Sequence, residues 1–500
     1  MAQLDAQPFP PGDYPVVVVG TGPGGLQTSY CLGRLGIDHA LLSSDDAPGG
    51  MFRLYPILQR LISWSKPYSP SERGTRAYLR YDWNSLLADD PNHQALVAEM
   101  MDGTSYFPSR PEMEKGMTAF AERAGVTARY DCTWQSTGRG DDDGLVLTTS
   151  HGDYRCKAAV FALGMAEPWK PSIPGIDEVP HYVSVKTPEE YAGRSVFIIG
   201  KRNSGFELAD GLLPWARQIV LASPRPTRLS VLTHSIAAAR ARYMQPYEDH
   251  VLGGGNVVLD ASIERIERHA DGYRVHAQGT TRPGDLAFDV DEVIAATGFE
   301  VPLRDLPDLG VATFMQGRLP AQTPFWESAS VPGVYFAGAV TQGSIGLKKY
   351  GIPSASASVE GFRHNARVLV RHIAQKHFGI DPPRPRISAE DAPDLLLTEA
   401  TCGPELWNQR AYLARAIAVE AGGVFDDGVV PLAHFVDSGG PDGLAIAVET
   451  DAEGDIHPVV YVRRRGDVEE HLLPSSPLHD YRTPERRADV ERLLKPLRAE

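Results

Sequence analysis

The sequence predicts an α/β fold with two doubly wound domains and a small α+β domain at the C-terminus. Three observations support this prediction. A glycine-rich strand–turn–helix pattern begins near residue 14, a second one begins near residue 195, and mixed helix and strand patterns follow residue 394. The 500 residues also exceed what one hydrophobic core usually organises, so several domains are expected.

Composition and charge exclude several classes of protein. Hydrophobic residues make up 42% of the chain and charged residues 23%, which is ordinary for a globular protein. The net charge of −15 argues against nucleic acid or an anionic membrane as a partner. Residues 1–14 lack the apolar stretch of a signal peptide, and no window approaches the ~20 apolar residues of a membrane span. We therefore expect a cytoplasmic protein.

The first glycine-rich turn follows an apolar strand. Val16–Val19 is a run of β-branched residues, typical of a parallel strand buried on both faces. A G-x-G-x-x-G turn and a helix-like stretch, Leu26–Leu35, come next. Such glycines permit a tight turn, the approach of a pyrophosphate and close helix packing, while the helix N-terminus offers N–H groups to phosphates. The predicted contacts are Gly20, Gly22, Pro23 and Gly25.

The ribose contact of this site has two candidates. The usual carboxylate should end the second strand, His39–Leu42, but Ser43 stands there. Either Ser43 makes a weaker contact or Asp45 reaches back. Downstream, a Gly-Gly-x-aromatic segment resembles one found in FAD-binding members of this fold. That resemblance implies FAD rather than NAD, with contacts at Gly50, Met51 and Phe52.

Ser195–Gly205 repeats the pattern, with an apolar strand, a turn and a helix start. Arg202 occupies the slot of the middle glycine. Its guanidinium either forks onto the pyrophosphate or turns outward. The other predicted contacts in this turn are Gly200, Asn203, Ser204 and Gly205.

The next predicted strand, Gln218–Ala222, ends without a carboxylate. A carboxylate there would favour NAD, whereas arginine accommodates the 2′-phosphate of NADP. The alternative is a solvated surface loop. We therefore expect NADPH, with contacts at Ser223, Arg225 and Arg228.

Three further segments resemble the junctions of the superfamily that unites disulfide reductases and flavin monooxygenases. They are Ala158–Gly164, Asp291–Phe299 and Val331–Ala339, and many members carry Asp where Ala339 stands. The resemblance implies two Rossmann-like domains, with the NADPH domain inserted in the FAD domain, and cofactor contacts at Thr297, Gly298, Gly338 and Ala339. The predicted boundaries are 1–176 and 299–380 for FAD, 177–298 for NADPH and 394–500 for the C-terminal domain.

A narrower resemblance is to FAD-dependent oxidoreductases related to the endoplasmic-reticulum flavoprotein associated with degradation. It rests on Gln59–Lys66, Arg80–Leu87, Leu347–Tyr350, Gly361–Arg367 and Ile456–Tyr461. The chain shows neither a secretory signal nor a retention tetrapeptide, so we do not expect an endoplasmic-reticulum role.

The flavin-monooxygenase fingerprints match in part. Val179–Val185 lacks the expected histidine in register, and Ser65 stands where many monooxygenases have Asn, for which Asn84 is a substitute. The candidate catalytic residues are Ser65, Lys66, Asn84 and Lys348.

The four cysteines show neither C-x-x-C nor metal spacing, so we expect no metal site and no internal redox dithiol. A complete FAD and NADPH apparatus without a dithiol predicts a monooxygenase. It would use O₂ to oxygenate a small amine or sulfur substrate through a C4a-hydroperoxyflavin. The alternatives are an NADPH-dependent reductase of an external disulfide, quinone or partner protein, and a non-catalytic redox-sensing flavoprotein.

Residues 380–393 are rich in proline and acidic side chains and predict a linker. Beyond it, we expect a helix at Leu406–Glu420, strands at Leu444–Glu449 and Pro458–Arg463, and a charged helix at Pro484–Leu494. This domain either covers the substrate site or forms a homodimer interface. The sequence leaves both readings open.

Overall fold

The computed structural model describes residues 7–58, 60–140, 144–233, 238–344 and 354–498. The chain forms two compact units. Unit 1 contains Met1–Tyr55, Ser63–Gly164 and Val301–Glu500, and unit 2 contains Pro56–Ile62 and Met165–Glu300. The second unit is therefore an insertion in the first. None of the described helices is both long and apolar enough to cross a bilayer.

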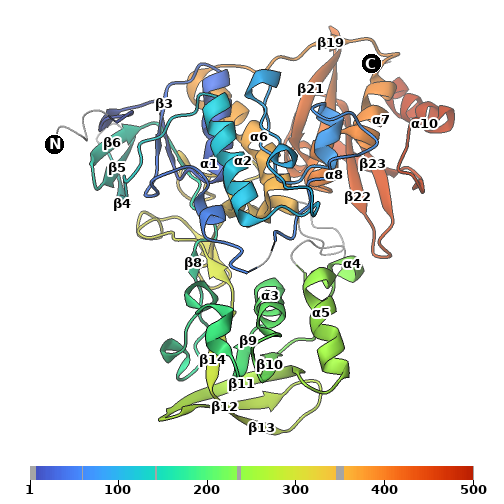
Figure 1. Ribbon diagram of the computed structural model, residues 1–500. Helices are drawn as coiled ribbons and strands as arrows, with labels where there is room; N and C mark the ends of the chain where they lie inside the picture. The colour runs from blue at the N-terminus through green and yellow to red at the C-terminus, as the bar shows by residue number, and fades with distance from the viewer. Residues whose placement is uncertain (1–6, 59, 141–143, 234–237, 345–353, 499–500) are drawn as a thin grey trace. The chain divides into compact units, whose positions relative to one another are not determined.

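Unit 1 is organised around a four-stranded parallel sheet, in the order β18-β7-β2-β3. All but one of its strand residues are buried, as their apolar side chains require. Helix α1 connects β2 to β3, and α6 packs against α1 (Figure 1). The elements are β2 (Val16–Val19), α1 (Pro23–Arg34), β3 (His39–Leu42), β7 (Ala158–Phe161), β18 (Val334–Phe336) and α6 (Val359–Phe378).

A second sheet of unit 1, in the order β1-β6-β5-β4, extends from the first. Helix α2 (Arg110–Arg123) begins with a capping box in which Ser109 and Glu112 bond each other's backbone N–H groups. The strands are β1 (Gly12–Asp13), β4 (Trp134–Arg139), β5 (Leu145–Thr149) and β6 (Gly152–Cys156).

Unit 2 contains a six-stranded sheet in the order β13-β12-β11-β10-β9-β14. Strands β11, β10, β9 and β14 are parallel neighbours in that order. Strands β11, β12 and β13 form an antiparallel meander. The elements are β9 (Ser195–Ile199), α3 (Asn203–Leu212), β10 (Gln218–Ser223), α5 (Ala241–Leu252), β11 (Val257–His269), β12 (Gly272–Gly279), β13 (Asp285–Val290) and β14 (Glu292–Ala295).

The inserted unit begins at Met165, earlier than the predicted residue 177. Strand β8 (Glu167–Pro168) pairs with β15 (Phe299–Glu300), so the two crossovers form one antiparallel ribbon. This pairing joins residues before 177 and after 298 to unit 2.

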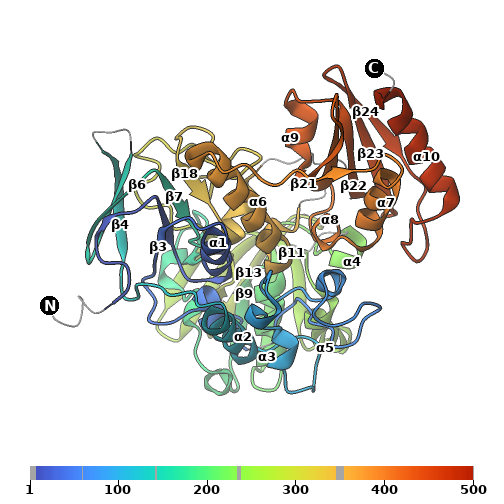
Figure 2. The same cartoon turned by 90° about the horizontal axis from the view of Figure 1, so that it is seen from above.

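The C-terminal part of unit 1 is an antiparallel sheet in the order β19-β21-β20-β22-β23-β24 (Figure 2). Alternate residues of its strands face opposite cores. Leu444 and Ile446 pack with α7 and α10, whereas Ala445 and Ala447 pack with α9. The elements are β19 (Arg386–Ile387), α7 (Ala392–Cys402), α8 (Pro404–Asn408), β20 (Leu413–Glu420), β21 (Gly423–Pro431), α9 (Leu432–Asp437), β22 (Gly443–Thr450), β23 (Ile456–Arg464), β24 (Asp467–Leu472) and α10 (Pro484–Leu494).

The predicted helix at Leu406–Glu420 is wrong. Only the short α8 is helical, and Leu413–Glu420 is the central strand β20. A run of small apolar residues satisfies both helical and strand periods, and the neighbouring strands β21 and β22 decide between them. The predicted linker likewise contains β19 and the start of α7. The two predicted strands and the terminal helix are confirmed as β22, β23 and α10.

Candidate cofactor-binding and active site

The first glycine-rich turn joins β2 to α1 and packs backbone against backbone. Gly20 has a φ of +106°, a conformation that favours glycine. A Cβ on Gly25 would lie 1.8 Å from the carbonyl oxygen of Gly20, and one on Gly24 would lie 2.4 Å from the Cα of Gly338. Side chains here would push the turn, α1 and the Gly338 segment apart. The fold thus brings two predicted cofactor motifs, far apart in sequence, into contact.

The N-terminus of α1 is suited to an anionic ligand. Its N-cap, Gly22, has no side chain to accept from the first-turn N–H groups, and that turn carries no acidic residue. The heavy atom nearest to a Cβ on Gly22 would be the Cα of Gly50, at 3.8 Å. Pro23 is in the first turn, where its missing N–H costs nothing. The bare helix end and its dipole fit the pyrophosphate of a dinucleotide.

Two polar residues follow β3. Ser43 is buried, and its hydroxyl oxygen accepts hydrogen bonds from Thr21 Oγ1 at 2.7 Å and from the Asp45 N–H at 3.1 Å. Burial raises the pKa of the Asp45 carboxyl, and the nearby Arg53 opposes that shift. Ser43 therefore shapes the turn, while Asp45 provides a carboxylate just beyond the strand end. Both remain predictions as ribose ligands.

The rest of the predicted FAD contacts lie in two 3-10 helices of unit 1. Gly50, Met51 and Phe52 belong to η1 (Gly50–Arg53), and a Cβ on Gly164 would lie 3.3 Å from the Met51 sulfur. Gly338 and Ala339 begin η8 (Gly338–Gly343). The Gly-Gly-x-aromatic segment therefore lies against the first crossover.

A buried chain of hydrogen bonds connects Gly338 to the C-terminal sheet. Thr341 donates its hydroxyl proton to the Gly338 carbonyl at 2.7 Å, and Asn365 of α6 donates to Thr341 Oγ1 at 3.0 Å. Gln409, which follows α8, donates to the Asn365 side-chain oxygen at 2.7 Å. The C-terminal part of unit 1 thus supports the segment predicted to hold the flavin.

The second glycine-rich turn, between β9 and α3, repeats this geometry. Gly200 has a φ of +131°, and a Cβ on it would lie 2.3 Å from the Ala296 carbonyl oxygen. A Cβ on Gly205 would lie 2.2 Å from the Gly200 carbonyl oxygen. Exposed Arg202 is the N-cap of α3, whose first turn again has neither a side-chain cap nor an acidic residue. An arginine side chain therefore replaces the bare middle glycine of an otherwise similar frame.

Exposed arginines follow β10, as the prediction of NADPH requires. Among the described residues, the side chains of Arg225 and Arg228 form no hydrogen bond or ion pair. Ser223 pairs with Asp260 of β11 in the parallel ladder. Asp260 forms an ion pair with the buried Lys201 of the glycine turn. This pair is not visible in the sequence, because only the register of β10 and β11 brings Asp260 to the end of β10.

Three other predicted contacts of unit 2 have structural partners. Asn203 bonds the backbone of Ala238 at 3.2 Å and of Arg240 at 2.9 Å. Thr297 donates its hydroxyl proton to the Trp169 carbonyl at 2.5 Å, and the Gly298 carbonyl accepts from the Trp169 N–H at 3.0 Å. Ser204 lies in the first turn of α3.

The candidate catalytic residues Ser65 and Asn84 are fully buried and belong to one network. Ser65 donates to Asp82 Oδ1 at 2.8 Å, and Asn84 Nδ2 donates to Ser65 Oγ at 3.0 Å. Asp82 also accepts from the N–H groups of Asn84 and Ser85 at 3.1 and 3.2 Å. The network ties two loop segments together and leaves neither side chain exposed to solvent.

Lys66 differs from these neighbours because it is exposed. Its ammonium lies 5.7 Å from the centre of the Trp64 ring. Lys348, the fourth candidate, lies outside the described residues. The catalytic roles of all four residues remain predictions.

All four cysteines are free thiols. Burial raises the pKa of Cys31 to about 11 and that of Cys156 to about 12, and it also raises the pKa of Cys132. Thiols held protonated are poor nucleophiles. No group of three or more potential ligands in the described residues is arranged to hold a metal ion.

Comparison with known proteins places this geometry in context. A family model described as pyridine nucleotide-disulphide oxidoreductase matches residues 17–338. FAD-dependent oxidoreductase domain-containing protein 2 of Danio rerio is 27% identical over 421 residues, which are 74% of this chain and 60% of that protein. The chain thus spans about three fifths of that relative. A ferredoxin–NADP reductase of Thermus thermophilus is 25% identical over 65% of this chain and 83% of its own length.

Two solved structures share the fold. A flavin-containing monooxygenase from Stenotrophomonas maltophilia has a TM-score of 0.55 at 20% identity, covering 72% of this chain and 98% of that one. The bacillithiol disulfide reductase of Staphylococcus aureus has a TM-score of 0.56 at 15% identity, covering 73% and 99%. The same two-domain, Rossmann-type architecture therefore occurs in an oxygenase and in a reductase.

Proposed function

The chain belongs to the pyridine nucleotide-disulphide oxidoreductase family, and from this membership we propose that it is an FAD-dependent, NADPH-consuming monooxygenase of a small amine or sulfur nucleophile. It is a flavin-dependent oxidoreductase whose cofactors are FAD and NADP(H). The use of O₂ and the class of substrate are the proposed part. The observation that carries the proposal is a pair of glycine cradles, the glycine-rich turns Gly20–Gly25 and Gly200–Gly205, in a chain whose four cysteines are all free and not arranged as C-x-x-C.

In the first cradle, the bare N-terminus of α1 with Gly20, Gly22 and Gly50 would hold the pyrophosphate of FAD. In the second, the N-terminus of α3 with Gly200 would hold that of NADPH, and Arg225 and Arg228 its 2′-phosphate. When bound, FAD supplies electron transfer from NADPH to O₂, so that one oxygen atom enters the substrate and the other leaves as water.

The chain's own residues would position the cofactor. The series of hydrogen bonds from Gln409 through Asn365 and Thr341 to the Gly338 carbonyl is buried throughout, so it holds the segment that begins at Gly338 in one place. The Ser65–Asp82–Asn84 network likewise fixes the backbone beside exposed Lys66. A dry, fixed surrounding favours oxygen transfer over loss of the oxidant to water.

A reductase is the second candidate. The similarity to a ferredoxin–NADP reductase favours electron transfer to an external acceptor. Reduction of a disulfide through an internal dithiol would need two close cysteines, and Cys31, Cys132 and Cys156 are buried with raised pKa values. The acceptor would therefore be an external disulfide, a quinone or a partner protein.

One experiment separates these activities. Purified full-length protein is given NADPH in air and without O₂, with and without candidate amines, thiols, disulfides and quinones, while NADPH, O₂ and H₂O₂ are measured. The monooxygenase proposal expects an amine or sulfur compound to raise NADPH and O₂ consumption equally, with little H₂O₂. NADPH consumption that persists without O₂ when a disulfide or quinone is added would establish the reductase instead. Absence of NADPH oxidation under all conditions would leave the redox-sensing role.

A further inference from the structure

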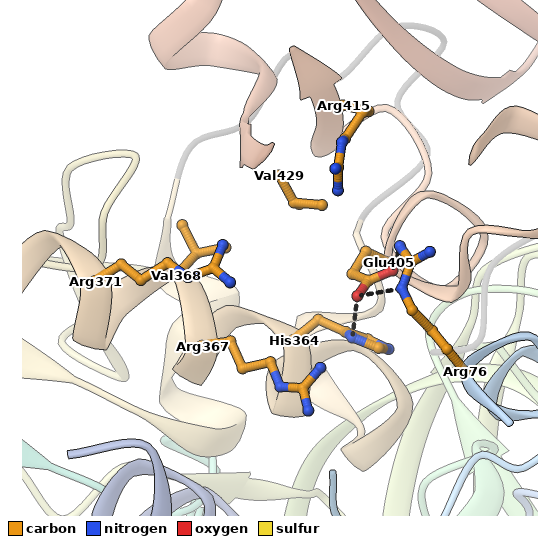
Figure 3. A pocket seen from close by; sticks show the side chains of 8 residues that line it. All are labelled: Arg76, His364, Arg367, Val368, Arg371, Glu405, Arg415 and Val429. Carbon is orange, nitrogen blue, oxygen red and sulfur yellow. Dashed lines mark hydrogen bonds and ion pairs between the residues drawn. The ribbon is translucent and has the colours of Figure 1, made fainter. Parts of the chain in front are cut away.

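A cavity of about 230 Å³ lies in unit 1 between α6 and the C-terminal sheet. His364, Arg367 and Arg371 are spaced three and four residues apart, so they share one face of α6. Arg415 of β20 faces them from the sheet, and Arg76 and Glu405 lie beside His364 (Figure 3). These residues do not belong to either predicted dinucleotide site.

Three arginines of the cavity have guanidinium N–H groups to spare. Arg371 forms no hydrogen bond or ion pair within the described chain. One terminal nitrogen of Arg367 donates a hydrogen bond to the Asp89 carboxylate at 2.6 Å, and one terminal nitrogen of Arg415 donates to the Asp426 carboxylate. The Nε atoms of Arg367 and Arg415 are buried without a hydrogen-bond partner among the described residues. Buried unsatisfied donors are unfavourable, so the Nε groups of Arg367 and Arg415 call for an acceptor, while the exposed guanidinium of Arg371 is available to a ligand.

His364 adds a third buried polar group to the Nε atoms of Arg367 and Arg415. Its side chain is fully buried, and its Nδ1 has no hydrogen-bond partner among the described residues, although Glu405 Oε1 lies 3.8 Å away. Burial pulls the pKa of His364 well below its usual value, so the ring is neutral at pH 7. The Glu405 carboxylate is already used by Arg76, which bonds it at 2.6 Å and bonds Glu399 at 2.7 Å. Glu405 therefore does not satisfy the other donors.

We propose that this cavity binds a phosphate group. Guanidinium groups reach it from a helix face and from a strand, and in Figure 3 those of Arg371 and Arg415 point into the same space. A planar carboxylate would engage one such fork, whereas the tetrahedral oxygens of phosphate accept from several directions at once. The bound phosphate would connect α6 with β20 of the C-terminal sheet. Helix α6 also carries Asn365, which belongs to the series of hydrogen bonds that ends at the Gly338 carbonyl.

Calorimetric titration of the FAD-loaded full chain with inorganic phosphate, at constant ionic strength, tests the proposal. The wild-type protein should bind phosphate saturably, and Arg371→Gln should raise the Kd at least tenfold. Arg371 is exposed and unpartnered in the described chain, so its replacement should leave the fold intact. Arg371→Lys, which keeps the charge but not the fork, should fall between the two.

Two control variants assign the binding to this cavity. Arg282→Gln removes an exposed cation of unit 2, and the double variant Arg225→Gln/Arg228→Gln removes the predicted NADP phosphate contacts. Arg282→Gln should bind phosphate as the wild type does, and the double variant should keep the binding event that Arg371→Gln weakens, whatever it does to binding at the NADPH site. The proposal is overturned if the wild type does not saturate, if Arg371→Gln binds normally, or if only the double variant loses binding. Tighter binding of pyrophosphate or a phosphate monoester than of inorganic phosphate would show that the group belongs to a larger ligand.

Discussion

The two glycine cradles share one backbone frame but differ in what stands at its centre. In unit 1 the middle position is Gly22, and the helix end is bare. In unit 2 it is Arg202, and exposed arginines follow the next strand. In both cradles, a Cβ on the last glycine of the turn, Gly25 or Gly205, would clash with the carbonyl oxygen of the first glycine. The difference teaches that the packing of helix on strand is obligatory in both, whereas the way the phosphates are met is specific to each.

The largest effect is expected where the two cradles agree. Gly25→Ala places a methyl group 1.8 Å from the Gly20 carbonyl oxygen, so the free energy of unfolding should fall by about 3 kcal/mol and the purified protein should lose FAD. Urea unfolding and flavin content measure both. Gly33→Ala, in the same helix with nothing within 4 Å, is the control and should be neutral or slightly stabilising. Equal behaviour of the two variants would contradict the close packing.

Gly205→Ala breaks the second cradle alone. Its methyl group would lie 2.2 Å from the Gly200 carbonyl oxygen, so NADPH binding should be lost while bound FAD is retained. Fluorescence titration with NADPH and the flavin spectrum report the two separately. Loss of FAD with retention of NADPH would reverse the assignment of the cradles.

Replacing the arginines after β10 sharpens the difference between the sites. The double variant Arg225→Gln/Arg228→Gln should reduce the preference for NADPH over NADH by about tenfold per arginine, because each charged hydrogen bond to the 2′-phosphate is lost. The ratio of kcat/KM for the two nucleotides measures it, with Arg282→Gln as the exposed control. An unchanged ratio would favour the solvated-loop interpretation.

Arg202→Gly places a glycine at the middle position of the second cradle, where the first cradle has Gly22. If the guanidinium contacts the pyrophosphate, NADPH and NADH should both bind about tenfold more weakly, with no change in preference. Unchanged affinities for both nucleotides would mean that the side chain turns outward. The measurement is Kd for each nucleotide.

The smallest effect concerns the two candidates for the FAD ribose. Burial raises the pKa of Asp45, so its ionised, accepting form is lost at a higher pH than for an exposed aspartate. If Asp45 accepts from the ribose, FAD affinity should fall by about 1 kcal/mol as the pH drops through that pKa, and Asp45→Asn should remove the dependence. The alternative, a Ser43 contact, predicts that only Ser43→Ala weakens binding.

Local patterns predicted both cradles because strand, turn and helix there are consecutive in sequence. The glycines that permit close contact are visible as residues, so Gly20, Gly25, Gly200 and Gly205 could be found without a structure. Helix α1 begins at Pro23, three residues before the predicted start, because apolar periodicity begins only at Leu26.

Features set by distant pairing were not predictable. Strand β20 looks helical until its neighbouring strands are known, and Asp260 reaches the second cradle only through the register of β11. Ser65 and Asn84 were selected as candidate catalytic residues by resemblance, but their burial depends on Asp82 and an irregular loop. The cavity between α6 and the C-terminal sheet needs Arg415 of β20 to face α6, and the sequence alone does not place that strand beside that helix.

An anaerobic titration of the purified protein with NADPH tests the central claim most directly. The account predicts a yellow protein with FAD absorption bands that one equivalent of NADPH bleaches. A colourless protein that takes up no added FAD, or a flavin spectrum that NADPH leaves unchanged, would contradict it.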